Sequence, residues 1–233
     1  MFKPIEIFIG LRYTRAKQRS GFISFISMTS MLGVALGVMA LITVLSVMNG
    51  FEAQLREKIL GMASHVTVSE HRNALDTWQQ LGGDLIGNEE IIGWAPFVRA
   101  EVMLSANGRV SGSLLRGVLP EKEGEVSDIA EKMIEGNLEQ LTPSDFSIVL
   151  GSELARYLQV GVGDKVTVIT PQVTPTPAGI LPRLRRFTVA GFFEVGMYEY
   201  DRNLALIHLT DGSKLMRLNG GVTGIRLKLK DLF

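Results

Sequence analysis

The residues best suited to chemistry lie between positions 171 and 186, where prolines and arginines gather. The prolines of this stretch are Pro171, Pro175, Pro177 and Pro182. A proline has a fixed φ and no backbone N–H, so the stretch is stiff and unsuited to the interior of a sheet. Arg183, Arg185 and Arg186 can make charge-assisted hydrogen bonds to anionic groups. These residue types predict recognition of a partner rather than catalysis.

Strands expected at residues 165–170 and 186–193 make this stretch a hairpin loop of about fifteen residues, whereas most hairpin loops have about two to five. Ile180 and Leu181 supply apolar contact surface at the tip, and the prolines reduce the entropy lost on binding. We interpret the loop as a hook that docks on a partner protein; a solvated loop without a role is the alternative. The predicted docking residues are Pro175, Thr176, Pro177, Ala178, Gly179, Ile180, Leu181, Pro182, Arg183, Arg185 and Arg186.

Motifs of catalysis and of cofactor binding are absent from the sequence. No P-loop, G-x-S-x-G elbow or H-E-x-x-H pair occurs, there is no cysteine, and three histidines are scattered along the chain. The glycines from Gly161 to Gly163 precede an expected strand, which indicates a turn rather than a phosphate loop. A net charge of zero argues against nucleic acid as a partner. We therefore expect no catalytic residue, no metal and no cofactor in this chain.

A charge-free run from Ser20 to Phe51 must anchor whatever positions the hook. Its apolar centre, residues 28–48, makes a helix of roughly 31 Å, which matches a hydrocarbon core of roughly 30 Å. It is too long for a cleaved signal peptide, so we interpret it as a retained membrane helix. A wholly buried core helix is the alternative.

The charges that flank this helix set its direction and divide the chain. Lysines and arginines dominate the residues before it, which places the N-terminus on the cytoplasmic side. We expect a cytoplasmic segment at residues 1–19, which is either an amphipathic surface segment or disordered. A transmembrane helix at 20–51, a helical stalk at 52–61 and a periplasmic domain at 62–233 follow.

Small residues form one stripe along the membrane helix. Ser30, Gly33, Gly37 and Ala40 fall within about 80° of the helical wheel and include a GxxxG pair. Because small residues let another helix approach closely, we expect this stripe to be a packing face.

We expect the outer domain to have an α+β fold, because strand and helix patterns are interspersed. The clearest element is a hairpin at residues 98–118, turned at Asn107-Gly108. Since the sequence stops directly after a strand pattern, we expect the domain to be truncated at its C-terminal end. The other strands are expected at residues 65–69, 147–150, 204–209 and 223–230, and helices at 73–81, 121–135, 152–158 and 211–218.

The sequence resembles the transmembrane permeases of the lipoprotein-releasing (Lol) system, LolC/LolE type. The resemblance rests on residues 9–13, on the run 32–52 with its exit sequence SVMNGFE, and on the strand pattern of the outer domain. Residues 176–182 match the hook of the LolC-type subunit, and Arg185 matches a basic residue that follows it. Thr167 departs from the family, which has a basic residue there. The resemblance implies that three later spans and the end of a MacB-like periplasmic domain are missing.

The resemblance implies an ABC transporter that extracts outer-membrane lipoproteins from the inner membrane of Gram-negative bacteria. The implied partners are a cytoplasmic LolD-like ATPase that holds ATP and Mg, a second LolC/LolE-type permease subunit, the lipoprotein, and the periplasmic carrier LolA. The outward half of the membrane helix would line a lipoprotein cavity. The expected cavity residues are Leu41, Val44, Leu45, Met48 and Phe51; packing against lipid or a helix is the alternative for them.

Two other functions stay open. One is a MacB- or FtsX-like mechanotransmission permease that acts on another periplasmic partner, and the hook argues against it. The other is a membrane-anchored periplasmic enzyme, which needs titratable groups converging on one pocket. The sequence does not distinguish a LolC-type from a LolE-type or hybrid subunit.

Overall fold

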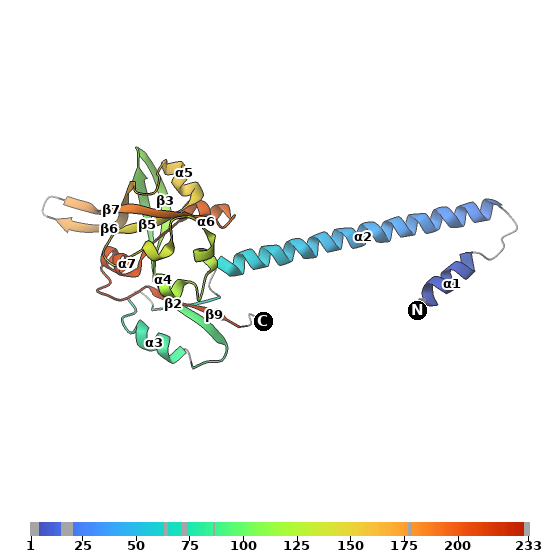
Figure 1. Cartoon of the computed structure of the whole chain (residues 1–233), viewed down its shortest axis with the longest axis horizontal. Coiled ribbons are helices and arrows are strands. Elements are labelled where there is room, and N and C mark those ends of the chain that lie inside the picture. Colours follow the sequence, from blue (N-terminus) through green and yellow to red (C-terminus); the bar gives the residue numbers. More distant parts are fainter. Residues whose placement is uncertain are drawn as a thin grey trace. The chain divides into compact units, whose positions relative to one another are not determined.

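A computed structural model describes residues 5–14, 21–62, 65–70, 74–85, 87–176 and 179–230. The chain divides into two compact units, Met1–Leu55 and Arg56–Phe233. The first is helical and the second combines a sheet with short helices (Figure 1). The predicted α+β class with one N-terminal apolar helix is confirmed.

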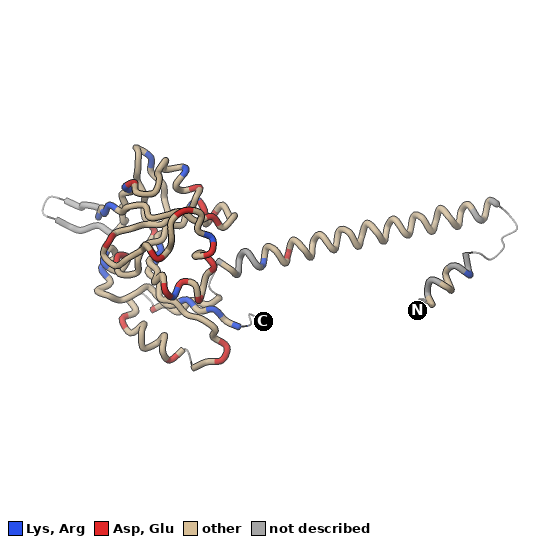
Figure 2. Tube along the Cα trace, in the orientation of Figure 1, with Lys and Arg blue, Asp and Glu red and all other residues tan. Residues whose placement is uncertain are grey.

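The first unit contains α1 (Ile5–Thr14) and most of α2 (Gly21–Met62). The predicted membrane helix and stalk therefore form one continuous helix. Its segment Phe25–Arg56 is long and apolar enough to cross a membrane, and none of its most apolar window is buried in the chain. Figure 2 shows α2 free of charged residues over most of its length. Thr29 and Thr43 donate their hydroxyls to carbonyls one turn earlier, which satisfies both hydroxyls without water. The limits of the cytoplasmic, membrane and stalk regions stay predictions.

A closed barrel of six strands forms the centre of the second unit. Its strands are paired in the order β2–β3–β8–β5–β7–β6, and β6 pairs again with β2. The bounds are β2 (Ile91–Ala106), β3 (Arg109–Val118), β5 (Ser147–Gly151), β6 (Lys165–Thr176), β7 (Gly179–Phe193) and β8 (Leu204–His208). The β2–β3 hairpin is confirmed, and Asn107 and Gly108 both take the positive φ that its turn requires.

Alternate residues of these strands fill the barrel interior. Every strand sends an apolar side chain inward, and the largest belong to Phe187, Leu104 and Leu115, each at most 1% exposed. The turn from Gly161 to Asp164 leads into β6, as predicted. The Asp164 carboxylate accepts a hydrogen bond from Gly161 N at 2.8 Å, and Gly163 N bonds Val189 O at 2.8 Å. The glycines therefore build a turn.

A wrapping segment covers one outer side of the barrel. It consists of α4 (Pro120–Glu123), η1 (Asp128–Lys132), β4 (Met133–Glu135) and η2 (Leu138–Gln140). The predicted helix at residues 121–135 is thus wrong. Val126, Ile129 and Leu138 are buried, and Ile129 and Leu138 pack on the outward side chains of β5 and β8. Burial of these apolar side chains on the curved barrel surface outweighs the helix propensity of the charged residues between them.

An outer layer continues the sheet beyond β2. It contains β9 (Gly224–Leu229), which pairs with β2, and β1 (Val66–Ser69), which pairs with β9. Helix α3 (Trp78–Leu85) covers it, and Trp78 lies 6.4 Å from Trp94 between ring centroids. The predicted helix at 73–81 begins too early and stops too soon. Gly82 lies inside α3 because a Cβ there would overlap the Trp94 ring, so glycine lets the helix pack closely.

Three short helices complete the domain: α5 (Ser152–Leu158), α6 (Tyr198–Asn203) and α7 (Leu209–Met216). The α5 prediction agrees at both ends. The predicted helix at 211–218 is shifted by two residues at each end, and α6 is not predicted. Leu154, Leu158 and Leu215 from α5 and α7 pack against the barrel core.

One ion pair is fully enclosed between the wrapping segment and the outer layer. Arg226 of β9 donates to Glu123 of α4, and their side chains are 4% and 0% exposed. Burial and, to a lesser extent, the positive charge of Arg226 lower the pKa of the nearby Arg116 to about 10. Removing one partner of the Arg226–Glu123 pair would leave the other charge buried without compensation.

We predict that Gly82→Ala lowers the free energy of unfolding by about 1–3 kcal/mol, because the new methyl group overlaps Trp94. Gly83→Ala is the matched control, since its Cβ would meet no atom within 4 Å. It should be neutral or stabilising by about 0.5–1 kcal/mol through helix propensity. Denaturant titration followed by tryptophan fluorescence measures both. Equal effects of the two substitutions would contradict the packing of α3 on Trp94.

Candidate functional site

The stretch predicted to be a long loop is a two-stranded arm. Strands β6 and β7 stay paired beyond the barrel until Thr176 meets Gly179, with a register shift between Thr170 and Val173. Figure 1 shows the two strands leaving the body together. The prediction of a fifteen-residue loop is therefore wrong. Prolines are tolerated here because a two-stranded ribbon has open edges, where a missing N–H costs no sheet hydrogen bond.

The predicted docking residues divide between the arm and its root. Pro175 and Thr176 belong to β6, and residues 179–182 belong to β7, whereas Pro177 and Ala178 lie outside the described residues. Arg183, Arg185 and Arg186 lie at the root, where β7 enters the barrel. The structure thus brings all the described docking residues onto one hairpin.

Two root arginines are held by contacts with the domain body. Arg183 Nη1 donates to the Leu215 carbonyl of α7 at 3.3 Å. The Arg185 guanidinium lies 3.8 Å from the centroid of the Phe146 ring, within the range of a cation–π interaction. Arg186 is opposite Thr167 on β6 and is exposed. Because neighbours in a strand alternate sides, Arg185 and Arg186 point to opposite faces of the arm.

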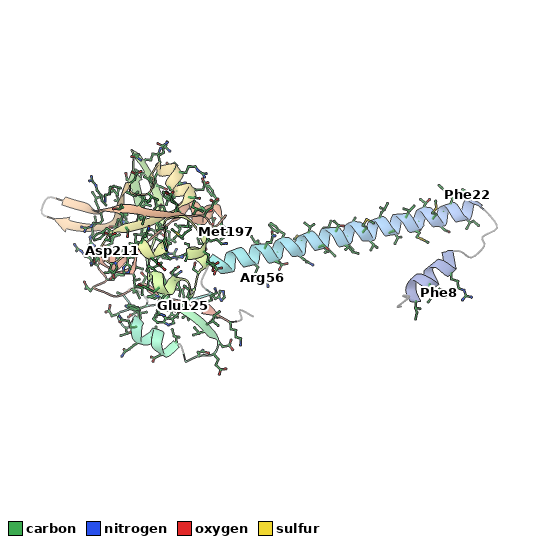
Figure 3. The ribbon with its side chains drawn as sticks, viewed as in Figure 1. Phe8, Phe22, Arg56, Glu125, Met197 and Asp211 are labelled. Atoms are coloured by element: carbon green, nitrogen blue, oxygen red, sulfur yellow. The ribbon has the colours of Figure 1, made fainter. Side chains whose placement is uncertain are left out.

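Phe146, which carries Arg185, is itself fixed by a buried carboxylate. Asp211 of α7 is fully buried and accepts hydrogen bonds from Ser144 N at 3.0 Å and Phe146 N at 3.2 Å. Ser144 and Phe146 both have positive φ, so these bonds hold a backbone that is otherwise unfavourable. Burial raises the pKa of Asp211, and the two backbone bonds act in the opposite direction. Figure 3 labels Asp211, which belongs to α7.

A basic hollow lies beside the root of the arm. Its volume is about 410 Å³, and its lining combines four cationic with three apolar side chains. The lining residues are Arg183, Arg185, Lys214, Arg217, Phe146, Leu184 and Leu215. Such a surface suits an acidic group flanked by an apolar one. Within the described ranges, no three His, Asp or Glu side chains gather to hold a metal ion.

The residues predicted on α2 are exposed in the described chain. Leu41, Val44, Leu45, Met48 and Phe51 are each more than half exposed. Ser30, Gly33, Gly37 and Ala40 are exposed as well. Figure 3 shows the α2 side chains projecting from the helix on all sides. The cavity and packing roles of these two sets stay predictions.

Sequence reasoning missed the four residues that build the root together with the arginines: Phe146, Asp211, Lys214 and Arg217. Phe146 lies in a loop and the other three in or after α7, far from the arm in sequence. Only Lys214 and Arg217 give a sequence signal, because their spacing places them on one side of a helix end.

Comparison with known proteins identifies similar chains. The family model of the MacB-like periplasmic core domain matches residues 27–232. The lipoprotein-releasing system transmembrane protein LolC of Xylella fastidiosa strain 9a5c is 47% identical, over 100% of this chain and 56% of its own length. LolC of Neisseria meningitidis is 46% identical, over 97% of this chain and 55% of its own length. This chain therefore spans little more than half the length of these relatives.

A solved structure, the periplasmic region of MacB from Actinobacillus actinomycetemcomitans, has a TM-score of 0.45 and 16% identity. The matched region is 69% of this chain and 67% of the MacB chain. The sequence matches confirm the resemblance to the Lol permeases that the motifs indicate.

The stability of the domain is expected to depend on pH through the N-terminal cap of α7, the helix that carries Asp211, Lys214 and Leu215. His208 caps α7, and its Nδ1 accepts a hydrogen bond from Thr210 N at 3.1 Å. Burial lowers the pKa of His208 below its ordinary value of 6.5, although Asp211 opposes this shift. The unfolded chain therefore binds a proton more readily than the folded one. The contribution of neutral His208 to the free energy of unfolding is therefore fully present above pH 6.5. It is lost as the pH falls through the pKa of His208 in the folded chain.

We predict that His208→Asn reduces this decline, because asparagine keeps the cap acceptor but does not titrate. The measurement is the midpoint of thermal unfolding between about pH 7.5 and pH 5.5. Parallel declines in the two proteins would show that His208 is not responsible.

Proposed function

The chain belongs to the family of the MacB-like periplasmic core domain, and from this premise we propose that it is part of a membrane subunit of an ABC transporter that releases lipoproteins. The observation that carries the proposal is the likeness to LolC, at 46–47% identity over nearly the whole chain. In this function α2 crosses the inner membrane and the α+β domain lies in the periplasm. The chain itself is not catalytic, and a separate cytoplasmic ATPase supplies the energy.

The chemistry of the cargo explains why such a machine is needed. Each buried CH₂ of an acyl chain contributes about 0.8 kcal/mol to membrane attachment, so several chains prevent spontaneous release. A protein surface must replace the bilayer around these chains during extraction. We propose that the outward half of α2, from Leu41 to Phe51, contributes to that surface. A second permease subunit packs on the stripe of Ser30, Gly33, Gly37 and Ala40.

The arm of β6 and β7 is proposed to capture the periplasmic carrier LolA. A paired ribbon is stiff, so docking costs less conformational entropy than ordering a free loop. The root adds cationic groups, and Arg185 is already ordered on Phe146 before the partner arrives. Thr167, which replaces a basic residue of the family, is opposite Arg186, so that strand pair retains one cation.

We predict that replacing residues 172–182 by Asn-Gly abolishes capture of purified LolA by this chain. Thr170 and Arg183 are paired, so a short turn can close the shortened hairpin without disturbing the barrel. A pull-down from detergent solution measures the capture, and a thermal unfolding midpoint within a few degrees of the parent's checks the fold. Unchanged capture by the shortened chain would remove the arm from the docking function.

Arg185→Ala tests the root separately and should weaken binding about tenfold, equivalent to roughly 1.4 kcal/mol. The matched control is Arg156→Ala, since Arg156 is exposed on α5 and pairs only locally with Glu153. Fluorescence titration with labelled LolA gives both affinities. If Arg156→Ala weakens binding as much as Arg185→Ala, general charge rather than the root is responsible.

A further inference from the structure

A second hollow lies on the outer face of the barrel. None of its lining residues also lines the basic hollow. It has a volume of about 870 Å³ and extends over β2, β3 and the start of the arm in β6. The wrapping segment packs on the outward side chains of β5 and β8, and Leu114 of the hollow's lining packs against the same apolar cluster. We call this hollow the sheet groove.

One row of residues across three strands forms the floor of the sheet groove. Met103 of β2 is opposite Gly112 of β3 on one side and Ile169 of β6 on the other. Residues opposite each other in an antiparallel pair point to the same face, so all three positions face outward. Leu114 extends the apolar floor, and Met103 is 50% exposed. A Cβ added at Gly112 would meet no atom within 4 Å, so the space above the floor is open.

The floor of the sheet groove favours an apolar occupant over a peptide. A peptide would bring an N–H and a C=O for each residue, and the side chains of Met103, Leu114 and Ile169 cannot satisfy them. Methionine adapts its shape to varied apolar ligands. The exposed polar side chains of the lining are Arg99, Glu101 and Asn203, and the charges of the first two cancel. The lining therefore demands no charge from its ligand.

We propose that the sheet groove binds an acyl chain of the lipoprotein on its way to the arm. This inference rests on the proposed function, because that function supplies the acylated cargo. The volume lies within the usual range of small-ligand sites, about 300–1,000 Å³, and the apolar floor with a few polar groups is their usual composition. Ile169 is part of the strand that continues into the arm, so the groove and the proposed carrier site are adjoining parts of one strand.

The test uses the absence of cysteine from the chain. Met103→Cys carries a bimane fluorophore in the full chain embedded in a lipid nanodisc, and the probe is stearate with a nitroxide at the end of its chain. The nitroxide quenches bimane only in close proximity. We expect saturable quenching at position 103. Ile134→Cys, an apolar position 58% exposed and outside the groove, should show only weak, unsaturable quenching.

Gly112→Trp is the blocking variant, since its side chain fills the open space above Met103. Added to Met103→Cys, it should raise the half-saturating concentration of stearate about tenfold. Capture of LolA should remain unchanged, so a failure of the groove and a failure of the arm give different results. Equal quenching at positions 103 and 134, or quenching indifferent to Gly112→Trp, would overturn the proposal.

Discussion

The arm depends on the closure of the barrel between β2 and β6. Only three residue pairs join these strands, Met103–Ile169, Leu104–Val168 and Ser105–Thr167. Leu104 and Val168 are fully buried, so the closure is held by apolar packing as well as by backbone hydrogen bonds. Beyond Ile169, strand β6 leaves β2 and continues with β7 alone. The same short contact therefore encloses the core, sets the root of the arm and forms part of the groove floor.

The arm carries the proposed docking surface, and its root is part of the packed domain. Its root is fixed through a chain of interactions that begins at the buried Asp211 and passes through Phe146 to Arg185. Asp211 comes from α7, Phe146 from the loop before β5, and Arg185 from β7. The orientation of the root therefore follows from the packing of the whole domain. In the proposed docking, the carrier would meet cations that are already ordered, which would reduce the entropic cost of binding.

Much of the architecture was predictable from local signals. The charge-free run predicts α2, the Asn-Gly turn predicts the β2–β3 hairpin, and the limits of α5 agree with its pattern. Errors occur where tertiary packing opposes local preference. The charged residues after Pro120 favour a helix, yet Val126 and Ile129 are buried along a curved path around the barrel. The prolines of the arm predict a loop, but an open-edged ribbon accepts them. The basic hollow and the sheet groove give almost no sequence signal, because distant strands and helices supply their linings.

We propose that the arm of β6 and β7 meets the carrier during lipoprotein release. Photo-crosslinking in living cells tests it most directly, with a photoreactive amino acid in place of Ile180 in the arm and, as control, in place of Asn107 at the β2–β3 turn. We expect an adduct with LolA from position 180 and none from position 107. Adducts of equal yield from both positions, or none from position 180, would contradict it.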